Sequence, residues 1–325
     1  MHHSLLPGLV ASAALSLTAL AATPATTHAS EVFSQSEVSI VVPWSPGGRT
    51  DVGTRLWAPY LESELGKPVV VLNRPGGGGM VGVRDLLSMD DGHAIGAFSL
   101  SQILSQWTKV PPLDMSQYKP VAMPFSLPFV LVVDKDAPWQ DAAEFVAYAQ
   151  DQRVTFGVSG SGTSGHIAAA TLASVSDIEA RFAPYDGDAG AVTALLGKEV
   201  EAVTAPMVSV VQQVEAGELR ALGVSLEHGD ELHEGIPTFK EQGIDFVLGD
   251  FGGALYLPAT VSDEFVEEWE QVLERTFADP ELQQRLADMY IQTDFVGAGE
   301  LEALVEEWNP HFEQLVEDLG LRLAP

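Results

Sequence analysis

Residues 38–51 read Val-Ser-Ile-Val-Val-Pro-Trp-Ser-Pro-Gly-Gly-Arg-Thr-Asp, and this stretch indicates the fold class. Its apolar first part predicts a short β-strand, the prolines and glycines predict a turn, and an amphipathic helical pattern follows over residues 51–65. Gly47 and Gly48 leave the backbone free to turn and to expose N–H groups at the start of that helix. The stretch therefore predicts a strand–loop–helix unit whose loop can hold an anion.

The same unit repeats along the chain. Further strands are predicted at residues 69–72, 94–98, 129–133, 154–158, 179–183, 200–204 and 219–225, and further helices at residues 80–88, 140–152, 166–175, 188–197 and 207–216. Strands that alternate with helices of this length are typical of a doubly wound α/β fold. From Ser262 to Leu319 the pattern predicts helices only. Such a tail usually packs on a domain begun earlier, so a discontinuous first domain is expected.

Two more glycine-rich loops follow predicted strands, at residues 73–82 and 157–166. Ligands of open α/β sheets bind at the carboxyl ends of strands, and helix N-termini with bare glycine backbone form anion sites. Both loops also match the dinucleotide fingerprint, as Gly77-x-Gly79-x-x-Gly82 and Gly160-x-Gly162-x-x-Gly165. Two matches in one chain show how often glycine-rich loops supply this pattern by chance. We therefore expect an anion site and no nucleotide cofactor.

Composition and charge exclude several classes of protein. The chain has 325 residues, 46% of them hydrophobic, which suits two domains that each bury a core. It has no cysteine, so a disulfide scaffold, a thiol nucleophile and a cysteine–zinc site are excluded. Lys and Arg total 16 against 46 Asp and Glu, a net charge of -30, which disfavours nucleic acid and anionic membranes as partners. Such an excess of acid is also expected to make the fold more stable at high salt.

The N-terminus has the pattern of a secretory signal. Residues 5–22 are small and apolar, and Thr27 and Ala29 have the −3 and −1 spacing of a cleavage site. The charged start of such signals is replaced by His2 and His3, and a single membrane anchor is the alternative reading. We expect residues 1–29 to be removed near Ala29 and the mature chain to act outside the cytoplasm, in the periplasm.

Other chemical patterns are weaker. Ser164 and His166 lie too close in sequence to indicate a catalytic triad. His228 and His233 lie in an acidic loop that could bind a metal, but their spacing follows no known ligand rule and a solvated loop is the simpler interpretation. We therefore predict no catalytic residue, no cofactor and no metal site.

A set of motifs spans the mature chain in collinear order. They occupy residues 41–51, 65–76, 79–82, 160–168, 184–187, 194–202, 217–222 and 236–243. In these motifs the sequence resembles the periplasmic substrate-binding proteins of tripartite tricarboxylate transporters, the Bug or TctC-type receptors. The resemblance implies a two-domain Venus-flytrap α/β fold that captures a small organic acid and delivers it to membrane permease subunits, as a monomer and not as an enzyme. A sensory receptor for a two-component system and an exported enzyme are the alternatives.

The resemblance also implies a division into domains. Residues 30–131 and 253–325 would form domain 1, and residues 132–252 domain 2. The chain would cross between them near Phe129–Asp134 and near Asp250–Tyr256. The ligand would lie in the interdomain cleft, held by backbone amides, hydroxyls and bridging water.

Carried over by position, the ligand-binding residues expected from the resemblance are Trp44, Ser45, Gly47, Gly48, Arg49, Thr50 and Asp51 from one domain, with Gly160, Gly162, Thr163, His166, Tyr185 and Asp186 from the other. Three positions depart from the family pattern: Trp44, Asp186 and the run Thr204-Ala-Pro206. Arg49 could point into the cleft or lie on the surface. The ligand expected is a small organic acid, with an aromatic or amino-bearing acid left open.

Overall fold

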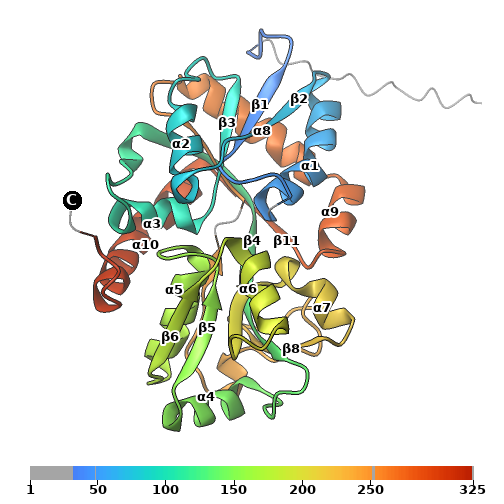
Figure 1. Ribbon diagram of the computed structural model, residues 1–325. Helices are drawn as coiled ribbons and strands as arrows, with labels where there is room; N and C mark the ends of the chain where they lie inside the picture. The colour runs from blue at the N-terminus through green and yellow to red at the C-terminus, as the bar shows by residue number, and fades with distance from the viewer. Residues whose placement is uncertain (1–31, 48, 251–252, 324–325) are drawn as a thin grey trace, which may run out of the picture.

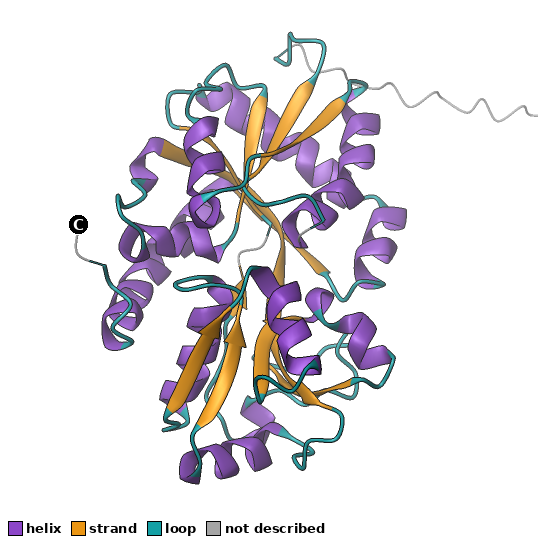
Figure 2. Ribbon diagram, viewed as in Figure 1, coloured by secondary structure: helices purple, strands orange, loops and turns teal. Residues whose placement is uncertain are grey.

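The computed structural model describes residues 32–47, 49–250 and 253–323, which form two lobes joined by one long strand that runs from one into the other (Figure 1). The proposed signal peptide and its cleavage point near Ala29 lie outside the described residues, as does Gly48. Helices cover both faces of the strands in each lobe (Figure 2), as the doubly wound prediction requires.

The first lobe is built on three parallel strands. Strand β1 lies between β2 and β3 and is parallel to both, and β10 is antiparallel to β3. The strands of this lobe are β1 (Val38–Val42), β2 (Val69–Asn73), β3 (Ala94–Phe98), β10 (Ala254–Pro258) and β11 (Gln292–Gly297). Its helices are α1 (Arg49–Leu65), η1 (Gly77–Gly79), α2 (Met80–Leu86), α3 (Leu100–Thr108), η2 (Met115–Gln117), α8 (Asp263–Phe277), α9 (Pro280–Ala287) and α10 (Ala298–Asp318).

The second lobe repeats this plan with a smaller sheet. Strand β5 is parallel to both β6 and β7, and the later part of β4 is antiparallel to β7 and β8. Its elements are α4 (Ala142–Asp151), β5 (Val154–Val158), α5 (Ser164–Val175), β6 (Ala180–Pro184), α6 (Gly187–Leu196), β7 (Ala202–Pro206), η3 (Met207–Ser209), α7 (Val211–Glu215), β8 (Leu219–Val224), η4 (Lys240–Gln242) and β9 (Gly249–Asp250).

Strand β4 (Tyr118–Asp134) belongs to both lobes. Up to Ser126 it pairs with β10 and β11 of the first lobe, and from Phe129 it pairs with β7 and β8 of the second. Between these parts, Leu127 and Pro128 pair with β9. The change of partners therefore falls between Ser126 and Phe129. The domain boundaries given above are not tested by this pairing and stay a prediction.

Two elements differ from the sequence expectations. The tail after Ser262 was expected to hold helices only, which is wrong, because β11 pairs antiparallel with β4. β11 contains the β-branched residues Thr293 and Val296 and the aromatic residue Phe295, which favour a strand over a helix. The edge of β4 beside them supplies the backbone partners for this strand. Helix α3 was not predicted, although Ser99 and Gln102 form a capping box at its start.

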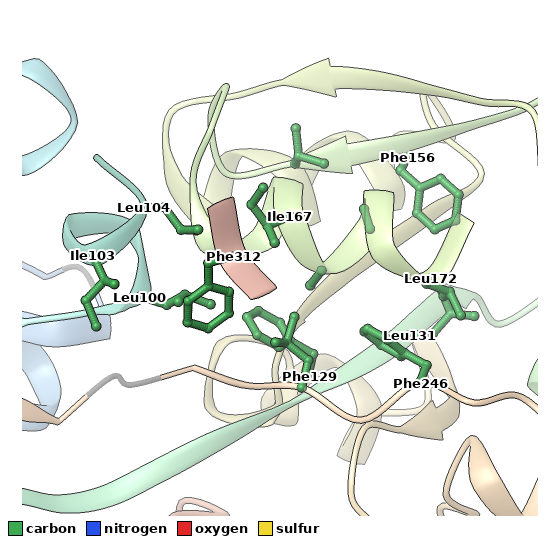
Figure 3. Packing of buried hydrophobic residues seen from close by; sticks show 14 of the residues in the cluster. Leu100, Ile103, Leu104, Phe129, Leu131, Phe156, Ile167, Leu172, Phe246 and Phe312 are labelled. Carbon is green, nitrogen blue, oxygen red and sulfur yellow. The ribbon is translucent and has the colours of Figure 1, made fainter. Parts of the chain in front are cut away.

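The apolar core of the second lobe continues into the first. Phe129 and Leu131 of β4 share one buried cluster with Leu104 of α3, Ile167 of α5 and Phe312 of α10 (Figure 3). This cluster packs α3 and α10 against the second lobe along one seam.

The tryptophans in the C-terminal helices lie where packing was predicted. Trp269 is fully buried and its indole N–H donates to the carbonyl of Gly92 at 2.8 Å. Trp308 is half-buried and its ring lies 5.6 Å from that of Phe312. None of the helices in the described ranges is both long and apolar enough to cross a bilayer.

Candidate functional site

The loop that follows β5 in the second lobe contacts α3 of the first lobe. The Ser164 N–H at the start of α5 donates to Ser101 Oγ in the first turn of α3, at 3.0 Å. Lys109 Nζ, just after α3, donates to the carbonyl of Ser161 at 3.2 Å, and Thr108 Oγ1 lies 3.4 Å from the carbonyl of Gly162. The loop at the carboxyl end of β5, where ligands of open α/β sheets bind, therefore lies against the first lobe.

In the first loop, Asp51 holds the backbone in shape. Its buried carboxylate accepts a hydrogen bond from the Gly47 N–H at 2.8 Å, from Asn73 Nδ2 at 2.9 Å and from Arg55 Nε at 2.9 Å. Asn73 Nδ2 also donates to the carbonyl of Trp44 at 3.1 Å, which ties the loop to the end of β2. The Gly47 amide, expected to face the ligand, is therefore used within the loop.

These hydrogen bonds control the ionisation of Asp51. Burial would raise the pKa of its carboxyl, but the hydrogen bonds from Gly47, Asn73 and Arg55, with the charge of Arg55, outweigh burial and hold the pKa below its usual value. The folded state therefore keeps Asp51 ionised, and its stabilising contribution is lost only as the pH falls through that lowered pKa.

Arg49, the first residue of α1, lines a small cavity between the lobes. The cavity has a volume of about 20 Å³ and is walled by Trp57 and Phe125 of the first lobe and Val208 of the second. Thr50 lies beside Arg49 in the wall. Among the described residues that line it, Arg49 is the only charged one. Arg49 thus lines a cavity to which residues of both lobes contribute.

In the loop of the second lobe, residues 157–166, the side chain of His166 is hydrogen-bonded to the loop backbone. Its ring is buried, and Nδ1 accepts a hydrogen bond from the Gly162 N–H at 3.0 Å. Thr163 Oγ1 donates to the carbonyl of Gly160 at 2.8 Å, and Ser159 Oγ lies 3.1 Å from Thr163 Oγ1. The amide of Gly162 is therefore engaged inside the loop, like that of Gly47.

His166 is expected to make the stability of the fold depend on pH. Burial lowers the pKa of His166 below its usual value of 6.5, so below about that pH the unfolded chain binds a proton that the folded chain does not. We expect the melting temperature to fall as the pH drops from about 7.5 to about 5.5, and to fall by a few degrees less in His166→Asn, which keeps an acceptor but does not titrate. The exposed His228, changed to Asn, is the control and should leave the slope unchanged. Parallel curves for wild type and His166→Asn would contradict this role.

The remaining expected residues have mixed positions. Trp44 is half-buried and Ser45 is exposed, both beside the start of α1. The hydroxyl of Tyr185 lies 3.5 Å from a carboxylate oxygen of Glu199, beyond the far end of α6, so it points away from the first lobe. Asp186 is exposed and precedes α6. The structure does not bring the Tyr185 hydroxyl together with the two loops.

Sequence reasoning missed four residues at the contact between the lobes, namely Ser101, Thr108, Lys109 and Asp188. Ser101 and Thr108 lie at the two ends of α3, a helix that the Ser99-x-x-Gln102 pattern after the strand 94–98 could have revealed. Asp188, in the first turn of α6, pairs with Arg49 of the opposite lobe at 3.5 Å. No local pattern signals such a pair.

The acidic loop with two histidines contains a buried histidine. His233 is almost fully buried, and its Nδ1 lies 2.7 Å from Asp230 Oδ1. His228 is exposed. The interpretation as a solvated loop is therefore wrong for His233. Within the described ranges no group of three or more potential metal-ligating side chains was found.

Comparison with known proteins gives a consistent family. The model of the family described as tripartite tricarboxylate transporter family receptor, TctC, matches residues 54–321. A protein encoded in the tcbD-tcbE intergenic region of a Pseudomonas species is 31% identical over 286 residues, which cover 85% of this chain and 84% of that protein.

Solved structures share the fold. The periplasmic binding protein BugD has a TM-score of 0.79 at 24% identity, covering 88% of this chain and 98% of its own. MatC from Rhodopseudomonas palustris, with bound malate, has a TM-score of 0.75 at 23% identity, covering 86% and 98%. Another R. palustris protein, with adipate, has a TM-score of 0.81 at 21% identity, covering 89% and 98%. The predicted two-domain α/β fold of periplasmic binding proteins is confirmed.

Proposed function

This chain belongs to the tripartite tricarboxylate transporter receptor family, and from that premise we propose that it captures a small organic acid between its lobes and delivers it to the membrane subunits of a tripartite transporter. The family consists of periplasmic solute-binding receptors, and we place capture in the periplasm, after removal of residues 1–29. The mature chain acts as a monomer in this proposal.

One observation carries the choice of an acid as ligand. The helix α1 starts at the cavity between the lobes, and Arg49 is the only charged residue among the described residues in its wall. A helix N-terminus and a guanidinium both favour a carboxylate, even in a chain with a net charge of -30. The structural neighbours with malate and adipate support the same chemical class.

We divide the expected site residues by role. Ser45, Gly48, Arg49, Thr50 and Gly160 are proposed to face the acid, with Trp44 forming a wall. Gly47, Asp51, Gly162, Thr163 and His166 are proposed to hold the two loops in shape, since their polar groups are hydrogen-bonded within those loops. Tyr185 and Asp186 border the opening in this proposal.

Ligand entry requires the lobes to part. A cavity of about 20 Å³ has room for about one water molecule, far less than an organic acid needs. We propose that residues 30–131 with 253–325 move as one domain and residues 132–252 as the other, and that the two domains part for the acid and close again around it.

The proposed function is tested by a thermal-shift screen of the mature chain against mono-, di- and tricarboxylates. A ligand at 100 times its dissociation constant adds about 2.7 kcal/mol to the free energy of unfolding, which raises the melting temperature measurably. Uncharged sugars of similar size are the control. A melting temperature that no acid raises above the sugar control would contradict the proposal.

The contribution of Arg49 can be measured separately. In Arg49→Ala we expect the affinity for the acid identified by the screen to fall about tenfold or more, because a charge-assisted hydrogen bond in a half-buried site is lost. Isothermal titration calorimetry measures the change. Arg84→Ala, which removes an exposed cation from the same lobe, should bind like wild type. An unchanged affinity in Arg49→Ala would remove this residue from the site.

A further inference from the structure

An ion pair joins the two lobes at the cavity. Arg49 Nε, at the start of α1, lies 3.5 Å from Asp188 Oδ2 in the first turn of α6, and their side chains are 18% and 14% exposed. Ser209 Oγ donates to the same Asp188 oxygen at 2.9 Å, which fixes the carboxylate on the second lobe. The pair is therefore half-buried and oriented, unlike a flexible surface pair.

The position of Asp188 bears on ligand binding. Arg49 is the only charged residue among the described residues that line the cavity, and a carboxylate of this chain already lies beside it. An acid that enters the cavity needs the same guanidinium. Asp188 thus makes the ion pair with Arg49 that the carboxylate of a ligand would make.

We propose that Asp188 is a specificity-determining residue of the acid site, an inference that rests on the proposed function. In the ligand-free chain its carboxylate pairs with Arg49 and holds the lobes together. An entering acid displaces it from Arg49, and the displaced charge then repels the bound acid. This repulsion lowers the affinity of the chain for the acid, and it lowers the affinity more for an acid of higher negative charge.

The first consequence concerns the ligand-free shape. Without the pair, the lobes lose an ion pair that joins them, and the open state gains population. The second consequence concerns affinity. Removing the charge of Asp188 ends its competition for Arg49 and removes the repulsion, so an acid should bind about tenfold more tightly.

Two measurements on Asp188→Asn test these consequences. Small-angle X-ray scattering of the ligand-free mature chain should give a larger radius of gyration than wild type. Calorimetric titration with malate and with adipate should give tighter binding than wild type, with a gain that shrinks at high salt as the charges are screened. Asp151→Asn is the matched control: it makes the same change of charge on the second lobe, at an exposed position at the end of α4 and outside the proposed site, and should behave like wild type.

A charge-reversal variant keeps the test possible if Asp188→Asn does not fold. If Asp188→Asn has lost its folded near-UV circular dichroism, Arg49→Asp combined with Asp188→Arg replaces it, and should keep the wild-type radius of gyration while the single Arg49→Asp gives a larger one. An unchanged radius in Asp188→Asn, or in Arg49→Asp where that variant replaces it, would overturn the pairing of the lobes. Weaker binding of malate or adipate in Asp188→Asn would overturn the competition, because it would mean that Asp188 itself holds the ligand.

These outcomes are distinct from failure of the proposed function. If neither wild type nor Asp188→Asn binds any carboxylate of the screen, the proposed function fails, and the competition with it. The scattering measurement still decides whether Asp188 joins the lobes, since it needs no ligand.

Discussion

Replacing Asp51 by alanine is expected to lower the free energy of unfolding by about 2 kcal/mol and to weaken ligand binding more than tenfold. The buried carboxylate accepts hydrogen bonds from Gly47, Asn73 and Arg55, and alanine leaves all three donors without this acceptor. The loop that carries Arg49 then loses the contact that shapes it. Urea unfolding measures the stability and calorimetry the affinity.

Two variants make this result interpretable. Asp85→Ala removes an exposed carboxylate from the same lobe, 3.8 Å from Arg74, and should change the free energy of unfolding by less than about 0.5 kcal/mol. Asp51→Asn keeps the shape and one acceptor oxygen, so it should be less destabilised than Asp51→Ala. An Asp51→Ala protein as stable as Asp85→Ala would contradict the role assigned to this carboxylate.

Gly162→Ala is expected to weaken binding by about tenfold or more, because it forces the two lobes apart where they touch. A Cβ at this position would lie 2.9 Å from Thr108 Cβ of the opposite lobe, closer than two carbon atoms can pack. The backbone φ of Gly162 is +69°, which adds strain for any residue other than glycine. Calorimetry and the radius of gyration measure the effect.

The control for Gly162→Ala separates strain from contact. Gly217 has a φ of +67°, and a Cβ there would meet no atom within 4 Å. Gly217→Ala therefore carries the same backbone strain, of about 1 kcal/mol, without the interlobe clash. If both variants lose the same stability and both bind normally, the contact between Gly162 and Thr108 does not matter for binding.

The alternating strands and helices of this chain could be predicted because each one follows from a local pattern. The strands at 94–98 and 154–158 were predicted with the bounds that the structure shows. Strand β4 was predicted only from Phe129, because Pro120, Pro124 and Pro128 argue against a strand. The structure accommodates Pro120 beside a register shift in the pairing with β10.

The candidate site was predictable as a pair of loops but not as a set of side-chain directions. A glycine-rich turn after a strand indicates where a loop lies, but not what it contacts. The loop 157–166 contacts α3 of the first lobe, and the loop 43–51 contacts α6 of the second lobe through Arg49 and Asp188. Asp51 and His166 turn inward because Asn73 and Gly162 supply their partners, and those partnerships depend on the folded loop. Asp188 meets Arg49 only through the relative placement of the lobes, which no local pattern encodes.

We propose that a small acid lies between the lobes, against the starts of α1 and α5. A crystal structure of the mature chain with the acid that most raises its melting temperature tests this directly. We expect a carboxylate within hydrogen-bonding distance of the loop 45–51, beside Arg49, with the loop 159–163 closing on the other side. An acid bound elsewhere on the molecule, with the space beside Arg49 still occupied by Asp188, would contradict it.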